Sequence, residues 1–279
     1  MVGIVIAHYS SSGRLAKHLV NLIQELSKYS KNIIFVSTGI LESELSKLAP
    51  YATVIARENT GYDFWSYKVG LEELGDLSRF QKVVCFNSSF ICLKPDLLLE
   101  TAFSPDMPSG LNGITLSKQD SSHIQSYWFS FDGDLLRSSE ALQGWWGQLK
   151  PISERSSVVK YYEIGMSRWF VERGVAITAL FEPSREDLLV ALARLIASRR
   201  ARPEMSPDES MAVTFDLESA KALNPTHFLW DTLAREFGIL KLDLLINNPT
   251  QQDLRSYLEN LKKFDPGLLE LIEDAIACH

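Results

Sequence analysis

The sequence predicts an α/β protein with a mainly parallel central sheet that is flanked by helices. Short apolar runs, such as residues 2–7 and 33–36, alternate along the chain with segments whose apolar residues have helical spacing. Continuous apolar runs of this length are typical of strands covered on both faces, and their alternation with helices favours βαβ units. The chain has 279 residues, of which 46% are hydrophobic and 23% charged, so it can bury a large core without a metal or disulfide.

The first third of the chain has the most regular alternation. Leu15, Leu19 and Leu22 share one face of a predicted helix, and Ser37-Thr38-Gly39 ends the second apolar run. In this part we expect strands at 2–7, 33–36, 52–56 and 82–87, and helices at 13–28, 41–48 and 64–74.

The rest of the chain mixes short strands with longer helical segments. Aromatic residues alternate within 124–132, which favours a strand, whereas Pro203 and Pro207 mark a break in the helical pattern. We expect strands at 111–116, 124–132 and 175–180, and helices at 133–148, 156–173, 185–200, 208–222, 227–238, 251–262 and 267–277. The predicted organisation is a sheet-based core at 1–184 and a helical C-terminal extension at 185–279 that packs on the core.

Charge and cysteine content exclude several classes of function. With 28 Lys and Arg against 35 Asp and Glu, the net charge of −7 argues against a nucleic-acid partner and leaves phosphate-bearing substrates open. The three cysteines form no CxxC pair, which favours a reducing compartment and no zinc site.

No run approaches the roughly 18 apolar residues of a spanning helix. The apolar start, residues 1–6, lacks a basic region and favours a first strand over a signal peptide, so the expected location is the bacterial cytoplasm.

The loop before the predicted helix at 64–74 concentrates polar groups. Asn59 and Asp63 are suited to reading a nucleotide base or ribose through paired hydrogen bonds. Gly61 precedes the helix, whose first backbone N–H groups can hold an anion or a sugar hydroxyl. The alternative is an Asx-type turn followed by a helix cap, for which Asn and Asp are also preferred. Local chemistry alone leaves both interpretations open.

Five segments, in order along the chain, together resemble one family of enzymes. They are Arg57-Glu58-Asn59-Thr60-Gly61-Tyr62-Asp63-Phe64, Phe86-Asn87-Ser88-Ser89, His123-Ile124-Gln125-Ser126-Tyr127, Tyr162-Glu163-Ile164-Gly165 and Asn224-Pro225-Thr226-His227-Phe228-Leu229-Trp230. The element order around the first two is similar to the nucleotide-sugar half of GT-A glycosyltransferases. The complete set is similar to the rhamnan synthesis protein F family of polysaccharide glycosyltransferases.

This resemblance implies a GT-A-like fold and a glycosyltransferase that extends a bacterial cell-surface polysaccharide of the rhamnan or O-antigen type. It also implies two partners, a nucleoside-diphosphate sugar donor, dTDP-L-rhamnose, and a glycan acceptor that is lipid-linked. Transfer would proceed with inversion at the anomeric carbon. An alternative of another class stays open, namely a non-catalytic module that binds a nucleotide sugar or glycan within a larger polysaccharide-assembly protein.

The segment Asn87-Ser88-Ser89 follows a predicted buried strand, at the edge where open α/β sheets bind ligands. GT-A enzymes carry Asp-x-Asp at this position to hold a divalent cation, and the resemblance leads us to expect Asn-Asp-Ser. Ser88 replaces that Asp, and a hydroxyl is a weak ligand for Mg²⁺ or Mn²⁺. Three explanations remain: the metal is held differently, protein cations and backbone dipoles neutralise the diphosphate, or catalysis is impaired. A simple strand-terminating turn is the structural alternative.

Glu163 is the candidate catalytic base. The resemblance places it where GT-A enzymes deliver a carboxylate at a helix start, and an inverting transfer needs one base to take the acceptor proton. GT-A enzymes often have Glu-Asp at this point, whereas Ile164 takes the second place here. The alternative role for Glu163 is a first-turn residue that complements the helix dipole.

Four further residues are candidates for binding the acceptor or the sugar: His123, Gln125, Tyr127 and His227. The resemblance places His123 and Gln125 near the reacting sugars, and GT-A enzymes sometimes use a C-terminal His, here His227, on the metal or diphosphate. Aromatic faces suit sugar rings, and His or Gln side chains can bind hydroxyl groups. A buried structural role is the alternative for each of them. The basic residues Arg199, Arg200 and Arg202 predict either a solvated helix end or peripheral contact with the anionic inner face of the membrane.

Overall fold

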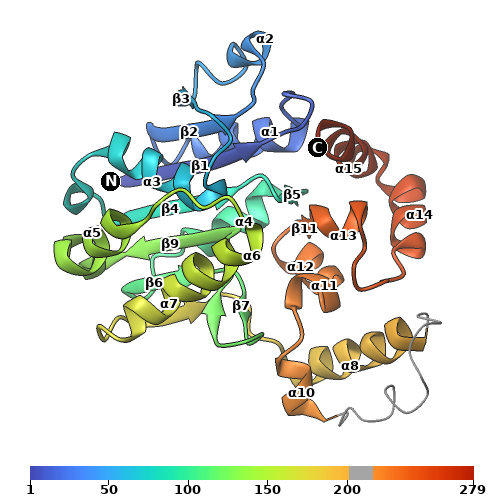
Figure 1. Cartoon of the computed structure of the whole chain (residues 1–279). Helices are drawn as coiled ribbons and strands as arrows, with labels where there is room; N and C mark the ends of the chain where they lie inside the picture. Colours follow the sequence, from blue (N-terminus) through green and yellow to red (C-terminus); the bar gives the residue numbers. More distant parts are fainter. Residues whose placement is uncertain (201–215) are drawn as a thin grey trace.

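The central sheet confirms the predicted α/β class. The computed structural model describes residues 1–200 and 216–279. Within these residues, seven strands form the sheet in the order β10-β6-β9-β4-β1-β2-β3 (Figure 1). Their bounds are β1 (Val2–Tyr9), β2 (Asn32–Thr38), β3 (Thr53–Ala56), β4 (Lys82–Asn87), β6 (Gly110–Gly113), β9 (Trp128–Asp132) and β10 (Ile177–Ala179). β1 to β4 are mutually parallel, whereas β9 lies antiparallel between β4 and β6.

Helices cover both faces of this sheet, as the continuous apolar strands require. Side chains of a strand alternate between its faces, so Ile4 and Ile6 of β1 enter one core while Val5 and Ala7 enter the other. The first core includes α1 (Lys17–Leu26) and α4 (Pro95–Ala102), and the second includes α3 (Tyr62–Leu74), α5 (Ser139–Gln148) and α7 (Ile164–Val171). The short helix α2 (Glu42–Leu45) connects β2 to β3.

Two predicted elements are interrupted near the edge of the sheet where the parallel strands end. The expected strand at 124–132 is divided into β8 (His123–Ile124) and β9, because β8 pairs with β7 (Leu116–Ser117) whereas β9 joins the central sheet. The expected helix at 156–173 consists of α6 (Arg155–Val158), a π-helical turn at Val159–Glu163, and α7. Single π-turns within helices are frequent at functional sites.

After residue 184, the described residues 185–200 and 216–279 are mostly helical and contribute one strand. Their helices are α8 (Arg185–Arg200), α10 (Leu217–Lys221), α11 (Pro225–Phe228), α12 (Trp230–Glu236), α13 (Leu242–Ile246), α14 (Arg255–Phe264) and α15 (Pro266–Cys278). In Figure 1, α11 to α15 lie beside the sheet, next to β5. Arg202, the two prolines at 203 and 207, and part of the helix expected at 208–222 lie outside the described residues.

A short sheet joins this C-terminal segment to the core. β11 (Ile239–Lys241) pairs antiparallel with β5 (Phe90–Cys92), which directly follows the turn at the end of β4. A third apolar cluster packs around this pair and includes Ile91, Leu240 and Ile272. Of the helices in the described part of the chain, none is long and apolar enough to cross a membrane.

Candidate functional site

The predicted polar segments meet at one edge of the sheet, where β1, β2 and β4 have their carboxyl ends. Because β9 runs in the opposite direction, it begins at this same edge, opposite the end of β4. The backbone of Asn87 donates to the carbonyl of Tyr127 over 3.1 Å, and that of Ser88 donates to the carbonyl of Ala7 over 3.1 Å. These bonds bring the turn at 87–89 beside the segment 123–127.

The loop that precedes α3 is held by one arginine. Arg57 donates to the carbonyls of Glu58 over 2.7 Å and Tyr62 over 2.8 Å, and to the hydroxyl of Ser66. Gly61 has φ of 72°, and a Cβ at this position would lie 2.7 Å from Cβ of Trp65, so the turn requires glycine. The loop is therefore a pre-formed element rather than a chance run of polar residues.

Asn59 and Asp63 take different positions in this loop. The side chain of Asn59 is exposed. Asp63 does not cap the helix, because Gly61 occupies the N-cap position; instead its carboxylate accepts a hydrogen bond of 2.8 Å from Nδ2 of Asn87. Burial raises the pKa of Asp63 to about 6, although Lys241 and Asn87 act in the opposite direction.

The turn at the end of β4 has most of its side-chain atoms engaged within the protein. Oδ1 of Asn87 accepts from the backbone N–H of Ser89 over 3.0 Å, in addition to the Asp63 contact of the same amide. Oγ of Ser88 accepts from the backbone N–H of Tyr9 over 3.1 Å and donates to its carbonyl over 3.2 Å. Ser88 thus points to the end of β1, and the turn presents Ser89 to the rest of the site.

Lys241 contacts this turn, although no sequence pattern had identified it as a site residue. Its ammonium donates to Oγ of Ser89 over 2.6 Å and lies 4.8 Å from the centroid of the Tyr127 ring. Burial lowers the pKa of Lys241 to about 8, while the carboxylates of Glu163 and Asp63 oppose that shift. The sequence carried a signal that we did not use, because Lys241 is the charged residue within the apolar run 239–242.

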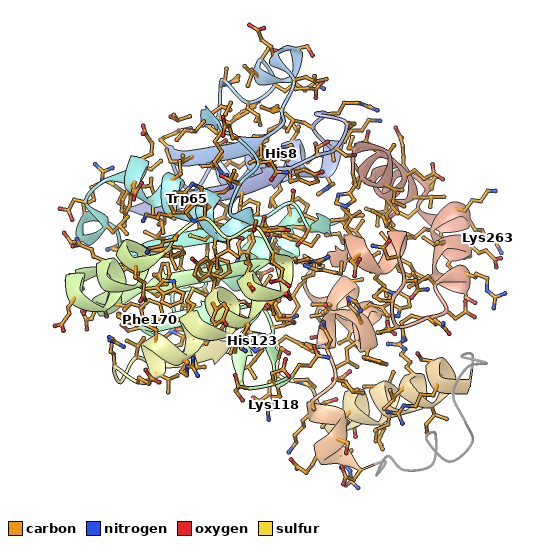
Figure 2. All side chains as sticks on the ribbon, in the orientation of Figure 1. His8, Trp65, Lys118, His123, Phe170 and Lys263 are labelled. Atoms are coloured by element: carbon orange, nitrogen blue, oxygen red, sulfur yellow. The ribbon has the colours of Figure 1, made fainter. Side chains whose placement is uncertain are left out.

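Glu163 is held by hydrogen bonds from Ser126 and by contact with His123. One carboxylate oxygen accepts from the backbone N–H of Ser126 over 2.8 Å and from the Ser126 hydroxyl. The other lies 3.5 Å from Nε2 of His123. Glu163 ends the π-turn and directly precedes α7, within the helical segment expected at 156–173, so it does not stand at a free helix start. Figure 2 labels His123 close to this segment.

The ionisation of the Glu163–His123 pair follows from these contacts. Burial acts to raise the pKa of Glu163, but hydrogen bonds from His123 and Ser126 outweigh it and lower the pKa. Burial acts to lower the pKa of His123, but the contact with Glu163 outweighs it and raises the pKa. Nδ1 of His123 lies 2.8 Å from the carbonyl of Ser121 and must therefore carry a proton. Hence Nε2 can donate to Glu163 only when the ring is an imidazolium.

Gln125, Tyr127 and His227 are buried. Thr115 Oγ1 lies 2.8 Å from Oε1 of Gln125 and 3.0 Å from the Tyr127 hydroxyl. The Gln125 amide reaches Asn224 over 3.3 Å, which links β8 to the start of α11. Burial lowers the pKa of His227. These hydrogen bonds bring Gln125, Tyr127 and the start of α11, which carries His227, into one region, and they give Gln125 and Tyr127 structural contacts.

The donor atoms around the turn do not suit a divalent cation. Within the ranges 1–200 and 216–279, no group of three or more His, Cys, Asp and Glu side chains is placed to hold a metal. The side-chain oxygens of Ser88 and Asn87 form hydrogen bonds within the protein, and the ammonium of Lys241 contacts Ser89 directly. A cation bound here would face this positive charge at close range.

The pKa of His123 offers a direct check of the pair. We expect histidine NMR to show a pKa above 6.5 for His123, whereas the buried His8 titrates at about 4. In Glu163→Gln the pKa of His123 falls, because the carboxylate no longer opposes burial. The charged pair therefore stabilises the fold below pH 6.5 while Glu163 stays ionised. This contribution is lost as pH rises through the raised pKa of His123, and again as pH falls through the lowered pKa of Glu163. An unchanged His123 pKa in Glu163→Gln, with the exposed Glu172→Gln as control, would contradict the proposed contact.

Comparisons with known proteins show which proteins this chain is similar to. The chain is 27% identical over 202 residues to Uncharacterized protein y4gN of Sinorhizobium fredii, which covers 70% of this chain and 51% of that protein. This chain therefore spans about half the length of that relative. It is 28% identical over 232 residues to Virulence protein VirA of Vibrio anguillarum, covering 78% of this chain and 70% of that protein.

A solved structure and a family model complete the comparison. The glycosyltransferase GlyE of Streptococcus pneumoniae aligns with a TM-score of 0.38 and 10% identity, covering 85% of this chain and 64% of that one. The family model for rhamnan synthesis protein F matches residues 33–194, more than half of the chain, and includes four of the five segments described above. The chain belongs to the rhamnan synthesis protein F family.

Proposed function

We propose that this chain is a glycosyltransferase that transfers a sugar from a nucleoside diphosphate to a growing cell-surface polysaccharide. The observation that carries the proposal is the site at the carboxyl edge of the sheet. It combines a carboxylate oriented by His123 and Ser126 with an ammonium that contacts the turn after β4. One group can accept a proton and the other can bind a phosphate, which are the two needs of glycosyl transfer from a diphosphate. Membership of a family named for rhamnan synthesis supports the same assignment.

In the proposed reaction, Glu163 takes the proton of the acceptor hydroxyl. The acceptor oxygen forms a bond to the anomeric carbon while the bond from that carbon to the phosphate oxygen breaks, and the nucleoside diphosphate leaves with the electron pair. The lowered pKa of Glu163 keeps it ionised, and so able to accept a proton, at neutral pH. Attack from the face opposite to the leaving group inverts the anomeric carbon.

The donor is proposed to lie between the loop before α3 and the turn after β4. Asn59, Gly61 and Asp63 would contact the nucleotide, and Asn87, Ser88 and Ser89 would lie beside the diphosphate. The rigid Arg57-braced loop supports this placement, since binding then needs little ordering of the chain. The sugar and the acceptor would lie toward His123, Gln125, Tyr127 and His227, which are all buried, and His123 lies 3.5 Å from Glu163.

The finer identity of the substrates rests on the family resemblance. We propose rhamnose as the sugar, supplied as dTDP-L-rhamnose, and a lipid-linked glycan as the acceptor. Such an acceptor places the reaction at the inner face of the cytoplasmic membrane, with peripheral contact of the protein. The competing proposal is a module that binds the nucleotide sugar without turnover, and the replacement of the expected Asp by Ser88 is the observation in its favour.

Release of nucleoside diphosphate from a donor panel separates these two proposals. The purified chain is incubated with dTDP-rhamnose, UDP-glucose or GDP-mannose and a rhamnan oligosaccharide acceptor, with chelator, Mg²⁺ or Mn²⁺. We expect acceptor-dependent turnover of dTDP-rhamnose, and NMR of the product gives its anomeric configuration. Donor binding without turnover, in the presence of an acceptor that a related enzyme extends, would favour the non-catalytic module.

A further inference from the structure

The leaving diphosphate of the proposed reaction needs a positive partner, and the turn after β4 supplies no acidic ligands for a metal. We propose that the ammonium of Lys241 binds the donor diphosphate and stabilises the leaving nucleoside diphosphate. It would take the place that Asp-x-Asp gives to a divalent cation in the enzymes that the sequence resembles. This inference rests on the proposed function, and it assigns to Lys241 the stabilisation of the leaving group.

The fold fixes Lys241 against the turn by two backbone connections. Lys241 lies opposite Phe90 in the antiparallel pair of β11 and β5, and β5 begins directly after Ser89. The next residue, Leu242, donates its backbone N–H to the carbonyl of Ser89 over 3.0 Å. Lys241 is therefore positioned by sheet geometry rather than by a flexible loop, which favours a preorganised charge.

The ammonium has hydrogen-bonding capacity that the protein does not use. Lysine has three N–H donors, and among the described residues one hydrogen bond is formed by the Lys241 ammonium, the 2.6 Å contact with Ser89. The face of the Tyr127 ring lies 4.8 Å away and accepts the charge without taking a donor in a strong hydrogen bond. The remaining donors can thus serve phosphate oxygens beside Ser89.

The burial of the Lys241 ammonium also favours a bound anion. Asp63, Glu163 and Asp243 attract Lys241, whereas Arg155 repels it. Burial disfavours the charged amine, and a bound diphosphate would compensate for that cost. Asp63, Glu163 and Asp243 would attract a divalent cation, but a cation placed directly against Ser89 would meet the ammonium at close range. In the proposal the protein cation takes the place of the metal at this turn.

Calorimetric binding of thymidine, uridine and guanosine diphosphates tests this inference. For the wild type we expect the same affinity in EDTA as in Mg²⁺ or Mn²⁺. Lys241→Gln should bind at least about tenfold more weakly, since a charge-assisted hydrogen bond to phosphate is lost. Lys241→Arg should keep most of the affinity, and the exposed Lys263→Gln on α14 should bind as the wild type does. Thymidine without phosphates should show no difference between variants.

The outcomes separate this inference from the proposed function. Wild-type binding that requires Mg²⁺ or Mn²⁺, or unchanged affinity in Lys241→Gln, would overturn the role of Lys241 and leave the glycosyltransferase proposal in place. Failure of the wild type to bind any of the three diphosphates would overturn the proposed function itself. Thermal unfolding checks that Lys241→Gln is folded. If it is not, the decision rests on Lys241→Arg and on the EDTA arm of the wild type.

Discussion

Glu163→Gln is expected to slow sugar transfer by about 10²- to 10⁴-fold, the usual contribution of a positioned general base. The amide has the shape of the carboxylate and can still accept from Ser126, so the local structure should persist. It cannot take the acceptor proton, and the loss should therefore appear in kcat. Steady-state kinetics measures the rate, and calorimetry with a nucleoside diphosphate measures donor binding, which we expect to be retained.

The control is Glu172→Gln, which removes an exposed carboxylate at the end of α7 and should leave the rate unchanged. A full rate in Glu163→Gln would show that another group is the base. Loss of donor binding in step with the rate would assign Glu163 to the donor site rather than to proton transfer.

Asp132→Asn is expected to have the largest effect on stability, about 3–5 kcal/mol, because it leaves a buried ammonium without its counter-charge. Asp132 on β9 pairs with Lys82 on β4 over 2.8 Å, and their side chains are 6% and 10% exposed. The second carboxylate oxygen accepts from Asn112 over 3.0 Å. Urea unfolding, followed by a spectroscopic probe, gives the change in the free energy of unfolding.

A double variant distinguishes the buried charge from a general loss of packing. Lys82→Met with Asp132→Asn removes both charges and should be more stable than Asp132→Asn alone. The exposed pair Arg137–Asp134 supplies the control, and Asp134→Asn should change the unfolding free energy by less than about 0.5 kcal/mol. Equal losses for Asp132→Asn and Asp134→Asn would contradict the account of a buried pair.

Strands of the sheet could be predicted where one continuous apolar segment forms the whole strand. β1 and β4 are continuous apolar runs, which only a doubly covered strand explains well. β5 and β11 have three residues each, which is too few for a periodic pattern, and neither strand was predicted. The π-turn before α7 also has no residue pattern that distinguishes it from ordinary helix, so the prediction of one helix at 156–173 did not reveal the turn that ends at Glu163.

The site was predicted in its parts but not in its contacts. Asp63, Asn87 and Glu163 were recognised because they follow strands or lie in segments that resemble a family. Lys241 was missed because its contact with Ser89 joins residues that are 152 positions apart. The contact also depends on β11, a strand that no sequence pattern predicted. A lone charge within the apolar run 239–242 marks Lys241 as unusual, but the identity of its partner Ser89 depends on the tertiary fold.

A crystal soaked with thymidine diphosphate in the presence of EDTA tests the central claim most directly. We predict that the nucleotide lies beside Asn59 and Asp63, that its diphosphate lies against Ser89 with Lys241 in hydrogen-bonding distance, and that the phosphate end points toward Glu163. A nucleotide bound elsewhere on the molecule, or a diphosphate that contacts neither Ser89 nor Lys241, would contradict this assignment of the site.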